Sequence, residues 1–156
     1  RVGVSWWGGA VADQIQQRSI PLEVFQRLFA VEGVTFVNLQ HGFRAEQVGQ
    51  LRGEAAKLRC YPIDPYEELD RWFDTIASLD LVISVDNSNV HFAGALGVPT
   101  WLLLPDHPNW RWPNQCDVAP WYASVQLLRK SSGQDWGSMI HWVAERLARH
   151  RSNAAA

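Results

Sequence analysis

Continuous apolar runs alternate along this chain with stretches in which apolar residues recur at the spacing of a helix. Residues 81–85 and 100–104 are apolar runs without alternation, as expected of strands that are covered on both faces of a sheet. Turn-forming residues follow the first run and precede the second, which marks where these strands end and begin. The other predicted strands are residues 1–6, 34–40, a short one at 58–61, and 125–129.

Helical spacing is clearest in residues 66–79, where Leu69, Trp72, Ile76 and Leu79 would share one face. Capping and breaking residues mark the ends of the other helical stretches. These predicted helices run from Pro21 to Gly33, over 45–57 around Gly49 and Gly53, over 90–96 before Gly97, and over 136–150 after an Asp135 cap.

Alternation of strand and helix from end to end predicts an α/β fold with a doubly wound, Rossmann-like sheet that is mostly parallel. We expect one domain over residues 1–150 and a short tail over 151–156. In such sheets ligands bind beyond the carboxyl ends of the strands, at the point where the strand order reverses. The segments in which to seek a site are therefore 6–19, 40–43, 86–91 and 105–112.

The strongest local signal is the polar segment from Asp86 to His91, between a predicted buried strand and a short helix. Asn87, Ser88 and their neighbours would leave backbone N–H groups free at the helix N-terminus, which is a ready site for a phosphate. His91, one turn further on, would point its ring toward the same opening. The alternative is that Asn87 or Ser88 only caps the helix and that His91 packs in a satisfied hydrogen bond.

Other polar and aromatic candidates lie in the remaining segments at this edge. Arg18 precedes the helix that begins near Pro21, where its guanidinium could clamp a phosphate, although a loop arginine is more often a solvated charge. Gln40 ends a predicted strand on the ligand side and could hydrogen-bond a ribose or a base edge, unless it is ordinary strand-end polarity. Trp6 and Ser19 bound the first loop at this edge and are further candidates for ligand contact.

The Pro- and Trp-rich segment 105–122 is too long for a simple connection and is a candidate binding loop. We expect Trp110 and Trp112 to border the ligand cleft, and Trp101, within a buried strand, to belong to the core. The alternative is that the two loop tryptophans only pin the loop against a neighbouring element, because aromatic side chains bury large areas wherever they occur.

Composition narrows the class of ligand. The chain has 156 residues, 47% of them hydrophobic and 19% charged, with a formal net charge of -2. This balance offers no basic footprint for nucleic acid or an anionic membrane, and the apolar runs are far shorter than the roughly 20 residues of a membrane helix. No secretory leader opens the chain, and Cys60 and Cys116 lack ligand spacing, so we expect free thiols and a cytoplasmic protein.

Several chemistries lack their motifs in this sequence. There is no Gly-x-x-x-x-Gly-Lys phosphate loop, no complete Gly-x-Gly-x-x-Gly fingerprint and no Gly-x-Ser-x-Gly elbow. The five histidines are scattered without the spacing of metal ligands, so no metal site is assigned.

Four sequence blocks, in order and spanning nearly the whole chain, carry a family resemblance. They are VGVSW at 2–6 with RSIPL at 18–22, VNLQ at 37–40, LDLVISVD through HFAGALG at 79–97, and PNWRW at 108–112 with PWY at 120–122. Together they resemble the donor-binding half of family nine glycosyltransferases, the GT-B enzymes that include heptosyltransferases. The likeness is strongest to the version that often follows tetratricopeptide repeats in bacterial proteins.

The resemblance implies an inverting, metal-independent transfer from a nucleotide-diphosphate sugar, with no other cofactor; the sequence accordingly contains no Asp-x-Asp pair. It implies that Arg18 neutralises the leaving diphosphate and that Asp86 orients the sugar. Asn87, Ser88 and His91 would bind the diphosphate, with Asn87 in place of the family's usual threonine.

The same resemblance places Gln40 at the nucleoside and makes Trp6, Ser19 and Trp110 candidate contacts of the donor. The general base and the acceptor would belong to a second, N-terminal domain of the same protein. Because Arg1 already begins a strand-like run and the only methionine is Met139, we expect this sequence to be a fragment of a longer chain that lacks that domain. Tetratricopeptide repeats are the other expected neighbour.

Two other classes remain open from the residues alone. One is a degenerate, non-enzymatic module that binds a nucleotide or a partner protein through the tryptophan-rich loop. The other is a different enzyme on a similar architecture, such as a nucleotide-sugar epimerase, which would act on the donor without an acceptor.

Overall fold

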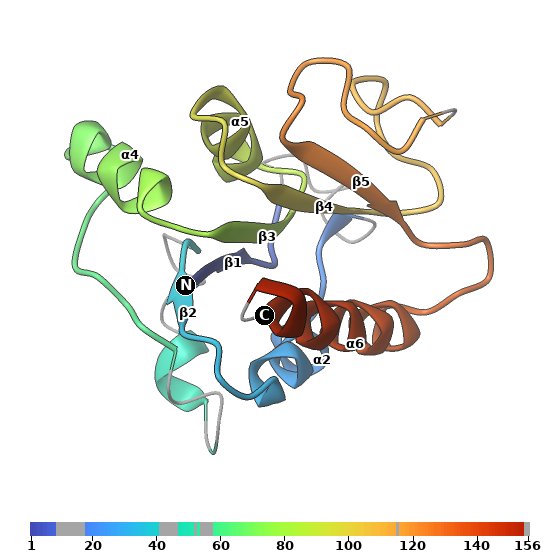
Figure 1. Cartoon of the computed structure of the whole chain (residues 1–156), viewed down its shortest axis with the longest axis horizontal. Coiled ribbons are helices and arrows are strands. Elements are labelled where there is room, and N and C mark those ends of the chain that lie inside the picture. The colour runs from blue at the N-terminus through green and yellow to red at the C-terminus, as the bar shows by residue number, and fades with distance from the viewer. Residues whose placement is uncertain (9–17, 41–46, 52, 54–57, 115, 155–156) are drawn as a thin grey trace.

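A five-stranded parallel sheet forms the centre of the molecule, with the strand order β2-β1-β3-β4-β5 (Figure 1). The structure is a computed structural model that describes residues 1–8, 18–40, 47–51, 53, 58–114 and 116–154. The prediction of a doubly wound α/β fold is confirmed. The strands are β1 (Val2–Ser5), β2 (Phe36–Asn38), β3 (Leu81–Val85), β4 (Thr100–Leu104) and β5 (Val125–Arg129).

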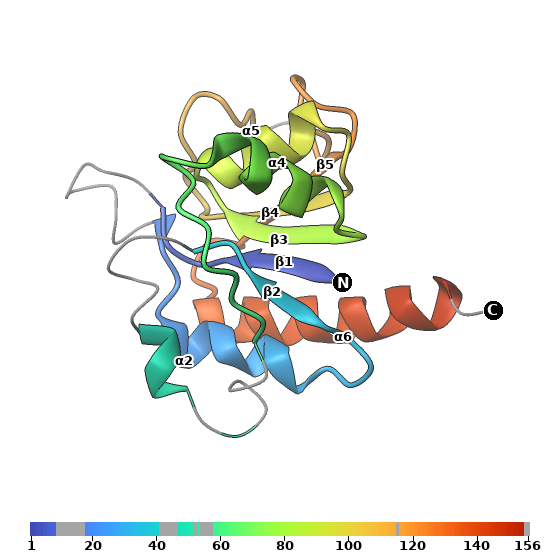
Figure 2. The same ribbon diagram turned by 90° about the vertical axis from the view of Figure 1, so that its left-hand side faces the viewer.

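Helices cover both faces of this sheet (Figure 2). Helices α4 (Leu69–Ala77) and α5 (Ser88–Ala95) lie on one face, and α2 (Leu22–Phe25) and α6 (Trp136–Ala154) lie on the other. The strand order reverses at β1, because β2 pairs with one of its edges and β3 with the other. The carboxyl ends of β1 and β3 therefore meet at the place where doubly wound sheets bind ligands.

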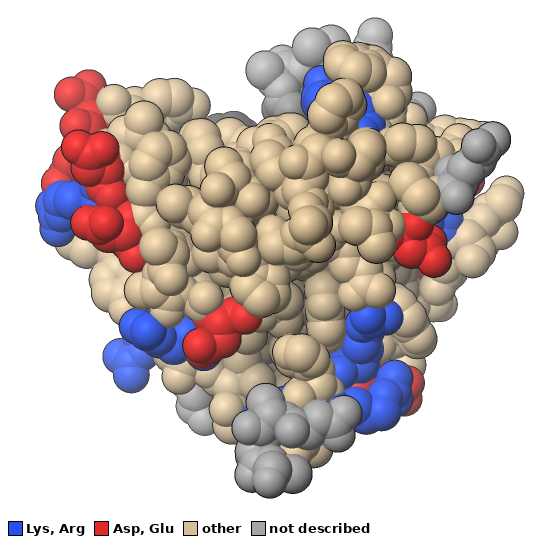
Figure 3. Space-filling view, turned by 45° about the horizontal axis from the view of Figure 1, so that its top comes forward, with Lys and Arg blue, Asp and Glu red and all other residues tan. Residues whose placement is uncertain are grey.

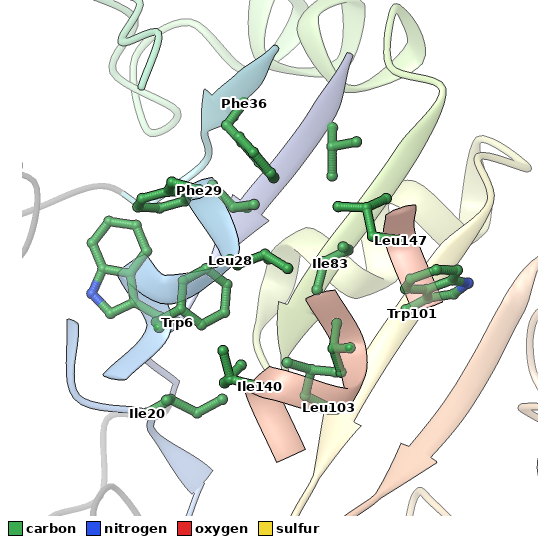
Figure 4. Close-up of a cluster of buried hydrophobic side chains, with 14 of the residues drawn as sticks. Trp6, Ile20, Leu28, Phe29, Phe36, Ile83, Trp101, Leu103, Ile140 and Leu147 are labelled. Carbon is green, nitrogen blue, oxygen red and sulfur yellow. The ribbon is translucent and has the colours of Figure 1, made fainter. Parts of the chain in front are cut away.

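The alternation of side chains along each strand divides the apolar residues between the two layers. Ile83 of β3 packs in the core between the sheet and helices α2 and α6, whereas Val82 belongs to the core under α4 and α5. Figure 4 shows the larger cluster, in which Trp6 lies beside residues of α2 and Trp101 beside α6. Trp101 is 6% exposed, so its predicted place in the core is confirmed.

Several predicted elements differ in length or type from the observed ones. The helix expected from Pro21 is a short α2 followed by the 3-10 helix η1 (Gln26–Ala30), and Gly33 follows with a φ of 70°. The strand expected at 58–61 is a single parallel bridge between Arg59 and Val37. Of the helix expected at 45–57, most lies outside the described residues, and the described part contains the 3-10 helix η2 (Gln47–Gln50).

The two helices on opposite faces also shift their ends. Helix α4 begins at Leu69 and not at residue 66, because residues 64–68 form a turn in which the Asp64 carboxylate accepts from the Tyr66 N–H at 2.9 Å. Helix α6 continues past the expected end at His150 to Ala154. Its predicted start is confirmed, since Asp135 Oδ1 accepts a hydrogen bond from the Ser138 N–H at 2.7 Å.

Candidate functional site at the switch between β1 and β3

The carboxyl end of β1 is held by the side chain of Gln40, which follows β2. Its Oε1 accepts from the Ser5 hydroxyl at 3.1 Å and from the backbone N–H of Trp7 at 2.9 Å. Asn38 fixes Gln40 in turn, because each donates one hydrogen bond to the other, at 2.9 and 3.0 Å. Gln40 therefore lies at the predicted edge of the sheet, and its side-chain oxygen is already hydrogen-bonded to the end of β1.

The first residue beyond β3 that was predicted to bind phosphate acts as a helix cap. Asn87 Oδ1 accepts from the Asn89 N–H at 3.0 Å, as in an N-cap of α5. Its Nδ2 donates to the Ser5 hydroxyl at 2.6 Å and to the Trp7 carbonyl at 3.2 Å. The capping interpretation thus holds for Asn87, whose amide also ties β3 to β1.

The two residues after Asn87 differ in exposure. Ser88, the first residue of α5, is exposed. Asn89 is buried, accepts from the Trp72 indole N–H at 2.9 Å and donates to the Leu39 carbonyl at 2.9 Å. No separate role was predicted for Asn89, although a polar residue at an inward position of a short, mostly apolar helix is a signal of buried hydrogen bonding.

The backbone after β1 approaches β3 closely. A Cβ atom at Gly8 would overlap the carbonyl oxygen of Asp86, so this position requires glycine. The Ser19 hydroxyl accepts from the Gly8 N–H at 3.1 Å, which ties buried Ser19 to the chain that leaves β1. Trp6 is fully buried against Phe25, so its ring offers no surface to a ligand in this structure.

Asp86 is the centre of a charged cluster at the start of α5. Its carboxylate is 2% exposed and lies 3.2 Å from the Arg18 guanidinium, which is 11% exposed. The same oxygen accepts from the Asn109 amide and lies 3.5 Å from the Arg111 guanidinium. The structure brings Arg18 to Asp86 and adds Asn109 and Arg111 from the tryptophan-rich loop, two residues to which no role had been assigned.

This cluster gives the site its sign of charge. Among the residues that the structure describes, two guanidinium groups, of Arg18 and Arg111, lie against the carboxylate of Asp86. Asp86 directly precedes the Asn87 cap, so the cluster adjoins the N-terminus of α5, whose dipole is also positive. An anion is therefore the ligand that this end of the sheet favours electrostatically.

His91 lies one turn into α5, beside the same cluster. Its Nδ1 is 3.1 Å from the Tyr122 hydroxyl, and its ring stacks on Trp112 with a centroid distance of 5.5 Å. Partial burial lowers the pKa of His91, the Asp86 charge opposes this shift, and the Arg111 charge lowers the pKa further. A lowered pKa favours the neutral imidazole at neutral pH.

The two loop tryptophans separate into different environments. Trp112 is 1% exposed and packs in a core with β4 and β5, so it pins the loop to the scaffold, which was the alternative interpretation. Its one link to the expected cleft is the stacking contact with His91. Trp110 is 80% exposed, with the Arg111 guanidinium 5.9 Å from its ring centroid. The expectation of cleft contact is therefore left to Trp110 alone.

A pocket of about 500 Å³ opens at the end of β2, beside the hydrogen bonds that Gln40 makes to the end of β1. Gln40 belongs to both, since it lines the pocket and binds β1. In Figure 3 acidic side chains gather along the edge of the molecule where α4 lies in Figure 1. The pocket is lined by Gln40, Cys60, Tyr61, Tyr66, Glu68 and Trp72, among others.

Cysteine state and helix hydropathy can be described for the residues that the structure covers. Cys60 and Cys116 are free, as predicted, and both residues are exposed; partial burial of the Cys60 sulfur raises the pKa of its thiol. No helix among the described residues combines the length and hydropathy that crossing a membrane requires.

Comparisons with solved structures define the class of fold. The structure of E. coli heptosyltransferase WaaC with ADP matches 95% of this chain and 44% of its own, with a TM-score of 0.63 and 15% identity. A family 9 glycosyltransferase from Veillonella parvula DSM 2008 matches 83% of this chain and 34% of its own, with a TM-score of 0.54 and 18% identity. The chain therefore has the Rossmann-like fold of one half of a GT-B glycosyltransferase.

One curated relative is similar in sequence. Protein FlbA of Caulobacter vibrioides is 29% identical over 149 residues, which are 94% of this chain and 25% of FlbA. The chain thus spans about a quarter of that relative and less than half of the WaaC structures, including the one with ADP-2-deoxy-2-fluoro heptose, of which it covers 43%. No protein-family model matches the sequence.

Proposed function

We propose that this chain is the donor-binding half of an inverting, metal-independent glycosyltransferase and that its ligand is a nucleotide-diphosphate sugar. The observation that carries the proposal is the pair of guanidinium groups, of Arg18 and Arg111, gathered at Asp86 beside the N-terminus of α5, at the switch point of the sheet. A diphosphate is the anion that such a fold typically receives there. The likeness in fold to a heptosyltransferase with bound ADP supports this choice.

The phosphates would lie between the α5 N-terminus and the two guanidinium groups. Exposed Ser88 would offer its N–H and hydroxyl, and half-buried His91 a ring nitrogen. Arg18 and Arg111 would neutralise the leaving diphosphate, and Asp86 would hold both guanidiniums and orient the sugar. Asn87 would contribute as the cap that shapes the turn.

The nucleoside would occupy the pocket at the end of β2. Gln40 links this pocket to β1, Ser19 is hydrogen-bonded to Gly8 beyond the same strand, and Tyr61 and Tyr66 are exposed aromatic residues that line the pocket. Aromatic rings of this kind stack on nucleobases. Exposed Trp110, whose ring centroid lies 5.9 Å from the Arg111 guanidinium, would contact the donor beside the Asp86 cluster.

Transfer would need the remainder of the protein. The chain spans less than half of the glycosyltransferase structures that it resembles, so we propose that the acceptor and the general base are held by the missing half. An inverting transfer requires both walls of a cleft, and we expect the isolated chain to fold and to bind nucleotide without turnover.

Calorimetry with ADP, UDP and GDP tests the binding. Arg18→Ala and His91→Ala should each weaken the best nucleotide by roughly ten- to hundredfold, as expected for one lost charge-assisted hydrogen bond. Arg149→Ala and His141→Ala, which alter exposed residues of α6, are matched controls that should leave affinity unchanged.

Unchanged affinity in both site variants would place the phosphates elsewhere. Tight binding by the full-length parent without transfer to any acceptor would instead favour a non-enzymatic nucleotide-binding module. Conversion of the donor without an acceptor would favour an epimerase.

A further inference from the structure

Tyr122 is built into the wall behind His91. Its carbonyl accepts from the Val125 N–H at 3.1 Å, which fixes it at the start of β5. Its ring meets the His91 ring edge-on, with a centroid distance of 5.8 Å, and its hydroxyl is the group 3.1 Å from Nδ1. Tyr122 is thus one of two aromatic residues that hold this imidazole.

Gly94 makes room for that ring. It lies one turn after His91 on α5, so both residues face the same side of the helix. A Cβ atom at position 94 would lie 2.8 Å or less from three carbons of the Tyr122 ring. Because the ring occupies the space that a larger side chain would fill, the contact between Tyr122 and His91 is a specific fit and not a chance surface pairing.

The hydrogen bond to Nδ1 decides where the imidazole carries its proton. A phenol O–H is a stronger donor than the N–H of a neutral imidazole, and the unprotonated ring nitrogen is a stronger acceptor than the phenol oxygen, so the favoured direction of this hydrogen bond is from the Tyr122 O–H to Nδ1. The ring proton of the neutral form then resides on Nε2. In the described part of the chain Nε2 has no partner, and the ring is only partly buried.

We propose that Tyr122 is a positioning residue that holds His91 in the Nε2–H tautomer, the form that donates a hydrogen bond to a phosphate oxygen of a nucleoside diphosphate. The inference rests on the proposed nucleotide site. Trp112 completes the arrangement, since its stacking at an interplanar angle of 24° prevents the imidazole from tilting away. His91 thereby enters the site as a neutral donor beside two guanidiniums, where an imidazolium would add further repulsion.

A double-mutant cycle tests this role. Tyr122→Phe keeps the ring over Gly94 and removes only the hydroxyl, so the variant should fold normally. We expect it to bind ADP, UDP or GDP about three- to tenfold more weakly than the parent, the effect of one neutral hydrogen bond. In a His91→Ala background the same substitution should have no effect on affinity, because its action passes through the imidazole.

Nitrogen-15 spectra of the free protein give an independent measurement. In the parent, the Nδ1 resonance of His91 should be that of an unprotonated, hydrogen-bonded nitrogen. Tyr122→Phe should shift this Nδ1 resonance and increase the population of the Nδ1–H tautomer. Equal affinity of parent and Tyr122→Phe, or an equal loss with and without His91, would overturn the positioning role while nucleotide binding stands. A parent that binds none of the three nucleotides would overturn the proposed function and this inference together.

Discussion

Replacing Asp86 by asparagine should destabilise the fold as well as the site. The substitution keeps the shape of the side chain and removes its charge. Arg18, only 11% exposed, would lose its buried carboxylate, and Arg111, 37% exposed, would lose a weaker partner. Removing one member of a buried ion pair typically costs about 3–5 kcal/mol, because the remaining charge stays desolvated.

The expected magnitude is smaller than that range for two structural reasons. The new amide can still pair with Asn109, and Arg111 is exposed enough for water to compensate it, so we count only the Arg18 contribution. A loss of about 2–4 kcal/mol remains for Asp86→Asn. For a domain of this size that corresponds to a decrease of about 5–15 °C in melting temperature.

Thermal and urea unfolding monitored by circular dichroism would measure the loss. The matched control is Glu145→Gln, an exposed carboxylate of α6 whose pairs with His141 and Arg149 should contribute less than about 0.5 kcal/mol. Arg18→Met combined with Asp86→Asn should recover stability, since it removes the desolvated charge. If Asp86→Asn is as stable as the parent, the cluster contributes nothing to the fold.

Three further predictions concern the wall around His91. Gly94→Ala should lower the melting temperature by displacing the Tyr122 ring, although helix propensity alone would stabilise it by about 1 kcal/mol; a rise would contradict the fit. Because Trp112 is buried and Trp110 is exposed, Trp112→Ala should lower the free energy of unfolding in urea by about 3–5 kcal/mol and Trp110→Ala by less than about 0.5 kcal/mol; equal losses would contradict this difference in environment. Because burial lowers the pKa of His91 below 6.5, the unfolded chain protonates first, so unfolding free energy should fall as pH drops below that value. Urea titrations across that range should give a shallower fall for His91→Gln, and identical slopes would refute the shift.

The strands were the most predictable part of the molecule. β3, β4 and β5 begin and end at the predicted residues, because an uninterrupted apolar run bounded by turn residues is a local signal. The first and third predicted helices were less predictable, since a turn capped by Asp64 delays the start of α4 and α2 passes into a 3-10 helix after Phe25. Such choices depend on side-chain hydrogen bonds that hydrophobic periodicity does not record.

The candidate site could be predicted by region more than by residue. The order of residues along the chain is enough to predict that Asp86 and His91 follow a buried strand and that Arg18 precedes a helix. The sequence does not predict that Asn109 and Arg111 reach the same carboxylate from a loop more than twenty residues away, because the local sequence of a loop does not determine which element the loop packs against.

By itself, then, the sequence determined the alternation of buried strands and amphipathic helices, and hence a doubly wound sheet with polar residues at its carboxyl edge. Tertiary structure alone decided what those residues do: Asn87 and Gln40 tie strands together, Trp6 fills the core, and Tyr122 meets His91. The physical reason is that apolar periodicity follows from the chain's own geometry, whereas hydrogen bonds and ion pairs form between groups that only the completed packing brings within about 3 Å of each other.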